Sequence, residues 1–396
     1  MCIWRATPSS TPPITRTDMR AHGRDLDRTQ LARLAGDLST LGGVRSVVLE
    51  DGAERGIRTL EFRTGSGLAF DVLVDRAMDI GPAEHAGRAF GWRSATGFRH
   101  PGLHEYRDED GISWLRSFSG LFVTSGLDHT LFTAEVDASH YHYPFRKTVW
   151  NGLHGRVANI PARLFGYGEE WRSEDICTLW AEGEVRQAAV FGEHLRLRRR
   201  IEADLGGNAI RLTDTVTNHG FDPTPHMFLY HINLGWPLVD EGARLVAPIA
   251  RTPWSTDSVR EQRVSYQRFP APQAGFVEQV YAHDMVADAH GSVSALVVND
   301  NLQMGLQLEW SINEFPHFFE WLHLHEGAYA VGLEPSTHAV AGEAAARADG
   351  SMIWLGAGES RSYHTVFSIL EGAAALADAV QTIQARQVQP TADVPG

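Results

Sequence analysis

The chain of 396 residues has few of the residues on which several common chemistries depend. It holds two cysteines, Cys2 and Cys177, which excludes a disulfide framework and a four-cysteine zinc site. Its one lysine, Lys147, stands in the polar stretch YHYPFRKT, so a Schiff-base mechanism would depend on an unpromising residue. No run of 18 apolar residues is present, which argues against a membrane-spanning helix.

Nucleotide-binding motifs and an excess of positive charge are also missing. Neither the P-loop pattern GxxxxGK[ST] nor a GxGxxG between a strand and a helix occurs, which disfavours nucleotide-dependent phosphoryl transfer and dinucleotide redox chemistry. The formal net charge is -14, which argues against nucleic-acid and anionic-membrane partners. With no apolar secretory segment near the start, we expect a cytoplasmic protein.

The chain reads as one β-rich domain between two tails. Residues 1–25 are rich in Pro, Ser, Thr and Arg, which predicts a disordered tail, and 389–396 form a second tail. Between them we expect a single domain, 26–388, because the composition does not change and no repeat appears. Alternating apolar and polar segments follow one another, and the turns TGSG and LGGN separate some of them. Helices do not alternate with these strands, so the pattern predicts a mainly β sandwich of antiparallel strands with a few short helices.

Four strand-like segments concentrate the polar residues that could carry chemistry. They are VDRAMDIG with Arg76, NGLHGRVANIPA with His154 and Arg156, HMFLYHINLGWPL with His231 and Asn233, and GAYAVGLEPST with Glu334.

Glu334 follows an apolar run and precedes Pro335. A carboxylate at the end of a buried strand must be paired, hydrogen-bonded or functional, and desolvation would raise its pKa towards the range of a general base. A surface glutamate at a strand end is the equally simple alternative.

Strand alternation places His231 on one face with Leu229 and Asn233. The histidine is therefore a candidate general acid at the edge of a pocket, or else a core histidine bonded to a backbone carbonyl.

His154 and Arg156 would share a face if the backbone there is extended, and the flanking glycines would allow a ligand to approach. A glycine-rich turn with exposed polar residues is the alternative. Arg76 lies between Asp75 and Asp79, so a structural salt bridge would also explain it.

A metal site is a weaker possibility. His323 and His325 alternate in WLHLHEG beside Glu326, and two histidines on one face of a strand can share a metal ion. His-x-His arises easily by chance, and we expect no metal.

Taken in order, the early arginine, LHG at 153–155, YHINLG at 230–235 and GLEP at 332–335 resemble the galactose mutarotase (aldose 1-epimerase) superfamily. The closest resemblance is to the aldose-1-epimerase-like branch described as DUF4432. It covers about residues 40–370 and implies a β-supersandwich fold.

The resemblance also implies roles for individual residues. Glu334 resembles the base that takes the proton of the anomeric hydroxyl, and His231 resembles the acid that protonates the ring oxygen. His154 and Arg76 resemble the sugar-binding histidine and arginine. Arg156, Asn233 and His323 depart from the family pattern and would reshape the binding pocket.

This interpretation makes the protein a sugar 1-epimerase that needs no cofactor. Its partner would be a small sugar or sugar derivative, and a homodimer is a possible assembly. Aromatic residues such as Trp236, Phe319 and Trp321 would be either walls for the sugar or core. Two alternatives stay open: a metal-assisted lyase or epimerase of an oxidised sugar, using the His323 and His325 pair, and a carbohydrate-binding protein without activity.

Overall fold

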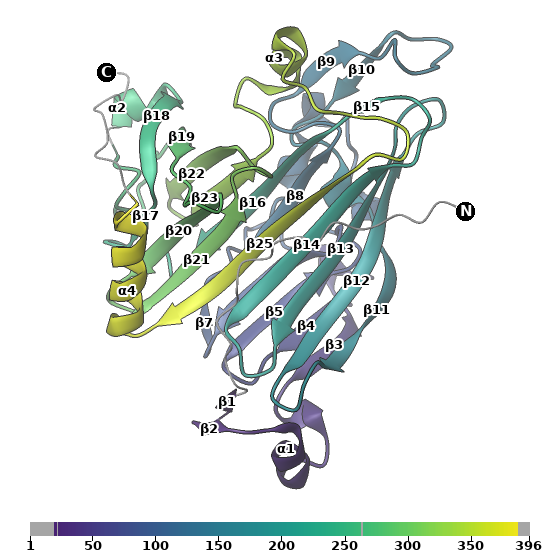
Figure 1. Cartoon of the computed structure of the whole chain (residues 1–396). Coiled ribbons are helices and arrows are strands. Elements are labelled where there is room, and N and C mark those ends of the chain that lie inside the picture. The colour runs from purple at the N-terminus through teal and green to yellow at the C-terminus, as the bar shows by residue number, and fades with distance from the viewer. Residues whose placement is uncertain (1–19, 22, 263, 387–396) are drawn as a thin grey trace.

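Two large antiparallel sheets form the body of the protein in the computed structural model, which describes residues 20–21, 23–262 and 264–386 (Figure 1). The mainly β architecture predicted from the alternating segments is confirmed. Residues 1–19, which make up most of the predicted N-terminal tail, and the C-terminal tail at 389–396 lie outside the described residues.

The larger sheet has eleven strands and carries the four polar segments or their neighbours. Its order is β18 (Ile249–Ser255), β19 (Gln279–Met285), β22 (His317–His325), β23 (Ala328–Ser336), β16 (Met227–Gly235), β8 (Phe122–Leu127), β6 (Asp79–His85), β5 (Leu68–Leu73), β4 (Arg58–Arg63) and β3 (Gly43–Val48), with β7 (Arg88–Ala89) paired to β6.

The smaller sheet has eight strands. Its order is β11 (Arg163–Trp171), β12 (Cys177–Ala188), β13 (His194–Asp204), β14 (Ala209–Asn218), β25 (Ser360–Glu371), β21 (Met304–Ser311), β20 (Ser292–Asn299) and β17 (Arg244–Val246). The turns TGSG and LGGN join β4 to β5 and β13 to β14, as predicted.

Short elements complete the described chain. Three two-stranded pairs are β1 (Arg20–Ala21) with β2 (Arg24–Asp25), β9 (Ala134–Asp137) with β10 (Thr148–Asn151), and β15 (Thr224–Pro225) with β24 (Trp354–Leu355). The α-helices are α1 (Arg28–Leu34), α2 (Ser258–Gln262), α3 (Gly342–Asp349) and α4 (Ala373–Gln384). The 3-10 turns are η1 (Leu38–Thr40), η2 (Gly52–Glu54), η3 (Pro101–Leu103), η4 (Glu109–Gly111), η5 (Ser113–Arg116) and η6 (Val157–Asn159). No helix in the described ranges is long and apolar enough to cross a membrane.

The main core fills the space between the sheets, and strand alternation decides which residues enter it. On β16, Phe228, Tyr230, Ile232 and Leu234 join this core. The alternate residues of β16 therefore face the other side of the larger sheet, as the sequence pattern predicted for His231.

A buried ionic cluster crosses the core and ties both sheets together. Arg199 of β13 is fully buried and donates two hydrogen bonds to Asp214, at 2.9 and 2.7 Å, and one to Asp79, at 2.8 Å. The hydroxyl of Tyr230 donates to Asp214 at 2.6 Å. Because Tyr230 precedes His231, the cluster also anchors the strand that carries the candidate acid.

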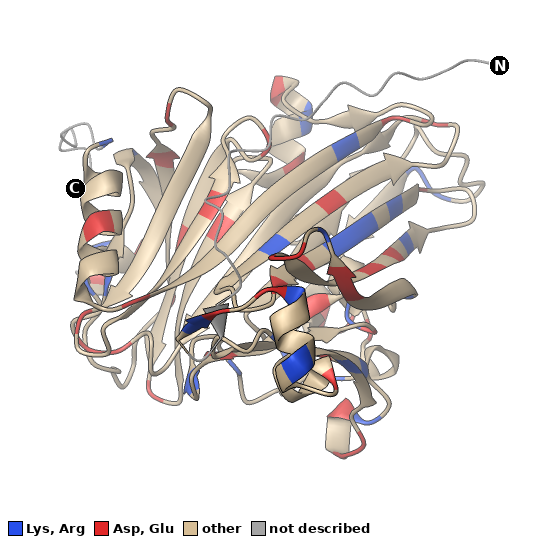
Figure 2. Ribbon diagram, turned by 60° about the horizontal axis from the view of Figure 1, so that its bottom comes forward, with Lys and Arg blue, Asp and Glu red and all other residues tan. Residues whose placement is uncertain are grey.

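The outer face of the smaller sheet carries charge of both signs. Arg198 and Arg200 on β13 form ion pairs with Glu182 on the adjacent strand β12. Figure 2 shows basic and acidic bands side by side on neighbouring strands. Exposed ion pairs of this kind contribute little to stability. We therefore interpret the charged residues of this face as a solvated surface and not as a functional site.

Candidate functional site

Glu334 and His231 meet on adjacent strands of the larger sheet. Leu229 pairs with Ser336 and Ile232 with Leu333, so the register places His231 directly opposite Glu334. The Nε2 atom of His231 lies 3.2 Å from Oε1 of Glu334, and both side chains are buried. Two residues 103 positions apart are thereby brought within hydrogen-bond distance.

Burial shifts the pKa values of Glu334 and His231 in opposite directions. It raises the pKa of Glu334 well above its usual value, and the negative charge of Glu278 adds to this effect. It lowers the pKa of His231 to about 3, although the interaction with the Asn233 side chain opposes this decrease. Both shifts favour the uncharged forms, a protonated carboxyl group on Glu334 and a neutral imidazole on His231.

His154 approaches this pair from the loop between β10 and η6. Its ring lies 5.6 Å from that of His231 and 4.5 Å from that of Trp114, measured between centroids. Its backbone N–H donates to the Leu131 carbonyl at 2.8 Å, and its own carbonyl accepts from Gly126 N–H at 3.1 Å. Burial lowers the pKa of His154 far below its usual value, so the ring is neutral.

The backbone conformation at residues 153–155 explains why glycine follows histidine in the LHG motif. His154 has a φ of 57°, in the left-handed region that few side-chain-bearing residues adopt. A Cβ on Gly155 would lie 2.4 Å from the carbonyl oxygen of Gly126 and 2.5 Å from that of His129, so only glycine fits. The backbone turns here and is not extended, so the condition under which His154 and Arg156 would share a face is not met.

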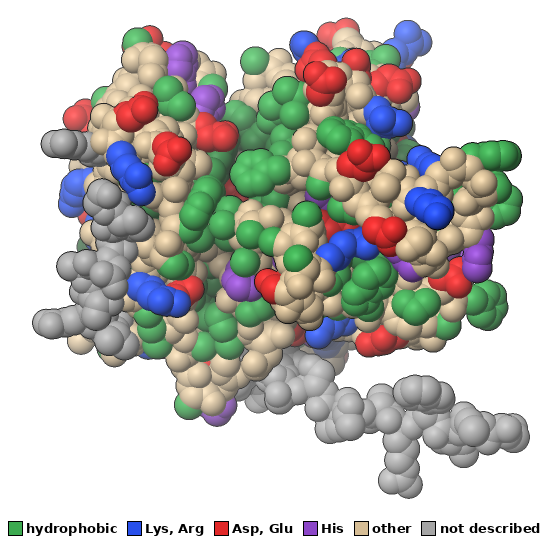
Figure 3. All heavy atoms as spheres, turned by 90° about the horizontal axis from the view of Figure 1, so that it is seen from above, with side chains coloured by type: hydrophobic (Ala, Val, Ile, Leu, Met, Phe, Trp, Pro, Cys, Tyr) green, Lys and Arg blue, Asp and Glu red, His purple; other side chains and the backbone are tan. Residues whose placement is uncertain are grey.

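Aromatic side chains surround the two histidine rings. Phe118 lies 4.7 Å and Trp321 5.4 Å from the His231 ring. Trp92 completes the group, 5.2 Å from Phe118 and 5.8 Å from Trp321. Seen from above, the molecule is hollowed, and hydrophobic side chains gather in the hollow (Figure 3).

The three aromatic residues named from sequence separate in the structure. Trp321 belongs to the cluster at the histidines, whereas Phe319 is buried in another cluster with Leu131 and Leu229. Trp236 is 68% exposed. One of the three is thus a wall of the candidate site.

Arg76 is buried beside the cluster, but each of its three guanidinium nitrogens already donates a hydrogen bond. Its guanidinium donates to the carbonyl oxygens of Ala158 at 3.0 Å, Arg99 at 3.1 Å and Ser117 at 2.8 Å. Ala158 and Ser117 belong to or adjoin the aromatic cluster, so Arg76 holds together loops that border the site.

The salt bridge considered for Arg76 from sequence is not formed. Asp75 binds Arg58 instead, and Asp79 binds Arg199. Burial lowers the pKa of Arg76 to about 10.

Asn233 lies two residues from His231 on the same face. Its amide donates to the carbonyl oxygens of Gly120, at 3.1 Å, and His231, at 3.2 Å. Its backbone carbonyl accepts from Trp92 N–H at 2.9 Å, which anchors the loop that carries this tryptophan. Asn233 therefore orders the surroundings of His231.

His323 stands next to Trp321 at the edge of the cluster, with the rings stacked 5.6 Å apart. The rings of His323 and His325 are 6.1 Å apart, and His325 also bonds the Glu326 carbonyl oxygen. Within the described ranges no group of three or more His, Cys, Asp or Glu side chains is placed to hold a metal ion. The histidine pair thus lacks a third ligand among these residues.

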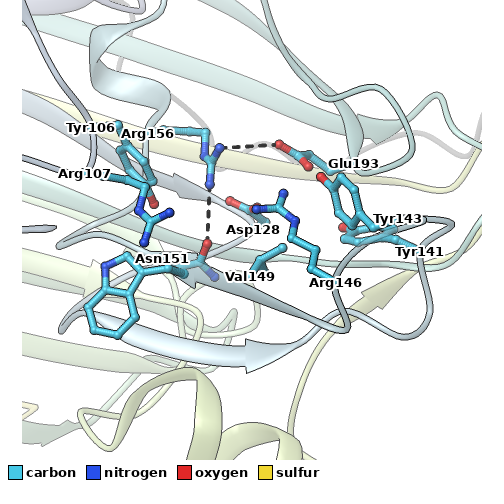
Figure 4. Close-up of a pocket in the computed structure, with 11 residues that line it drawn as sticks. Tyr106, Arg107, Asp128, Tyr141, Tyr143, Arg146, Val149, Asn151, Arg156 and Glu193 are labelled. Carbon is cyan, nitrogen blue, oxygen red and sulfur yellow. Dashed lines mark hydrogen bonds and ion pairs between the residues drawn. The ribbon is translucent and has the colours of Figure 1, made fainter.

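Arg156 lines a polar cavity to which neither Glu334 nor His231 contributes (Figure 4). Its guanidinium stacks 4.3 Å from the centre of the Tyr106 ring, and its Nη1 lies 4.0 Å from Glu193. Burial opposes its charge, but Asp128, Tyr106 and Glu193 hold the pKa of Arg156 above its usual value. The structure therefore does not bring Arg156 to the Glu334 and His231 pair.

The family model described as a domain of unknown function, DUF4432, matches residues 54–369. The chain belongs to the DUF4432 family.

Solved structures share the fold of this DUF4432 chain. A Klebsiella pneumoniae protein provisionally assigned as an aldose 1-epimerase has 24% identity and a TM-score of 0.78, with 88% of each chain covered. A galactose mutarotase-like protein from Clostridium acetobutylicum has 11% identity and a TM-score of 0.56, covering 83% of this chain and 98% of its own. A galactose 1-epimerase from Lactobacillus acidophilus has 12% identity and a TM-score of 0.51, covering 83% and 99%. Among the curated proteins, none matches this chain.

Sequence reasoning missed four residues of the candidate site. Trp92 and Phe118 come from loops and Trp114 from the 3-10 turn η5, where strand alternation gives no guidance. Glu278 lies just before β19 and accepts a hydrogen bond from the Trp321 indole N–H at 3.0 Å. An aromatic-rich loop segment and an isolated acidic residue were the only signals, and neither distinguishes a site from ordinary surface.

Proposed function

We propose that this protein interconverts the anomers of an aldose, as an aldose 1-epimerase-like isomerase. The observation that carries the proposal is the contact between Glu334 and His231, 3.2 Å apart and surrounded by aromatic side chains. A buried acid and base that hold one proton between them are what reversible ring opening requires.

The proton can occupy either member of the pair, and the two states serve opposite halves of the reaction. With Glu334 ionised and His231 protonated, the carboxylate takes the proton of the anomeric hydroxyl while the imidazolium protonates the ring oxygen. The C1–O5 bond breaks and C1 becomes an aldehyde. After rotation about the C1–C2 bond, Glu334 returns its proton to the aldehyde oxygen, and His231 takes the proton of the O5 hydroxyl as it attacks C1. The pair ends in its starting state.

The other residues support this chemistry by binding and placement. Neutral His154 and His323 offer ring nitrogens that hydrogen-bond sugar hydroxyls; Nδ1 of each is buried and has no partner in the described protein. Trp92, Trp114 and Trp321 provide apolar faces for the sugar ring. Arg76 and Asn233 act by ordering loops and strands around the pair.

The test is anomer exchange measured by NMR over a panel of neutral and acidic sugars. Glu334→Gln keeps the shape and removes the titrating carboxyl, so we expect exchange to fall by about 10²-fold or more. Glu326→Gln, an exposed carboxylate in the turn after β22, is the matched control and should keep full activity.

Two outcomes would contradict the proposal. One is exchange that persists in Glu334→Gln. The other is wild-type protein that binds sugars without accelerating exchange of any of them, which would favour a binding protein instead.

A further inference from the structure

A polar cavity of about 90 Å³ is lined by Asn151 and Arg156, which flank His154 in the chain (Figure 4). Asp128 comes from the loop after β8, Tyr141 from the segment between β9 and β10, and Glu193 from the turn between β12 and β13. Arg156 enters between them, and Figure 4 shows its side chain directed towards Glu193 and Asn151. Four separate segments thus converge on this cavity.

The buried groups of the cavity have unused hydrogen-bonding capacity. Tyr141 is only 8% exposed, and its buried hydroxyl, although it neighbours the Thr224 side chain, makes no hydrogen bond of good geometry within the described protein. The Nε of Arg156 is in the same condition. Glu193 is buried, and its ion pair with Arg156 is long, at 4.0 Å. Buried polar atoms normally have partners, so these atoms call for a molecule in the cavity.

Charge within the cavity is close to balanced. Asp128 and Glu193 are both buried, and burial together with Asp128 raises the pKa of Glu193 to about 7. Arg156 offsets the remaining negative charge. Two further guanidinium groups, those of Arg107 and Arg146, are exposed at the rim, where solvent screens their charge, and that of Arg146 lies 4.2 Å from the centre of the Tyr143 ring. The interior therefore favours a neutral ligand over a cation or an anion.

The geometry points to a neutral polyhydroxyl compound as the ligand of this cavity. A hydroxyl group both donates and accepts, so neighbouring hydroxyls can donate to Asp128 and Glu193 while accepting from Tyr141 and from Nε–H of Arg156. One water molecule needs about 10–15 Å³ of such volume, so the cavity is several times larger than a single water requires and leaves room for a small polyol or one edge of a sugar. The inference does not depend on the proposed epimerase activity.

Calorimetric titration with glycerol and erythritol tests this site, because these acyclic polyols have no anomeric centre. Tyr141→Phe removes only the hydroxyl, so we expect about tenfold weaker polyol binding. Because that hydroxyl makes no hydrogen bond of good geometry within the described protein, the stability of the unliganded protein should change little and anomer exchange should not fall. Tyr167→Phe, exposed on β11, is the matched control.

A second variant and a second class of probe locate the site. Glu193→Gln should also weaken polyol binding, whereas Glu334→Gln should leave it unchanged. The inference is overturned by equal binding in wild type and Tyr141→Phe, by inorganic phosphate or sulfate binding more tightly than the polyols, or by no saturable binding of either polyol to the wild type.

Discussion

Gly332 lies against both members of the proposed catalytic pair, and its replacement by alanine tests how tightly they are held. A Cβ at this position would lie 3.1 Å from Oε1 of Glu334, from Cε1 of His231 and from Cβ of Trp321. Gly332 is not among the residues with positive φ, so alanine meets no backbone penalty and the effect is purely one of space.

The size of the effect follows from these contacts. Carbon atoms pack best at about 3.5–4.0 Å, so the added methyl must gain roughly half an ångström. The Cβ of Trp321 is held by its strand, so Glu334 and His231 must move instead. We expect a loss of about 1–3 kcal/mol in the free energy of unfolding. Anomer exchange should fall by about tenfold or more, because a misplacement of about 1 Å costs as much as 10²-fold.

Chemical denaturation and NMR exchange on Gly332→Ala provide the measurement. Gly36→Ala is the control, since Gly36 lacks a positive φ and its added Cβ would have no atom within 4 Å. The control should change stability by no more than about 0.5 kcal/mol. Full activity and unchanged stability in Gly332→Ala would refute the close packing of the pair.

Two further predictions concern buried charge. Arg199→Met leaves Asp79 and Asp214 without their cation, and we expect urea denaturation to show a loss of about 3–5 kcal/mol in the free energy of unfolding. The control Arg198→Met, on the outer face, should lower it by about 1 kcal/mol or less. Equal losses in the two variants would refute the distinction between buried and exposed ion pairs. Burial lowers the pKa of His226 to about 3 from 6.5, so the folded state resists a proton that the unfolded state accepts. Stability should therefore be complete above pH 6.5 and decline towards pH 3, by up to about 1.4 kcal/mol per pH unit for this histidine. A flat stability profile over that range, measured by denaturation at several pH values, would contradict this.

Local patterns in the sequence were sufficient for the fold class. Alternation along 227–235 assigned the correct face to His231, and the turn at 64–67 placed a hairpin, because strand periodicity and turn geometry depend on neighbouring residues. The roles of Glu334 and His231 came from a resemblance, and they stay a proposal until activity is measured.

Contacts between distant segments were beyond sequence reasoning. The pairing of β16 with β23 puts Glu334 beside His231. Trp92, Trp114 and Phe118, which surround them, come from a much earlier part of the chain.

The arginines show most clearly the difference between what local sequence patterns predict and what contacts between distant segments add. The sequence by itself determined a mainly β chain with a small set of polar residues at its strands. It did not show whether Arg76 binds carboxylates or backbone carbonyls. Nor did it show that Arg156 lines a polar cavity away from Glu334 and His231. The folded arrangement settles both points, because a long charged side chain takes its partners from whatever segments the fold places within reach, and two consecutive left-handed residues, His154 and Gly155, turn the chain ahead of Arg156.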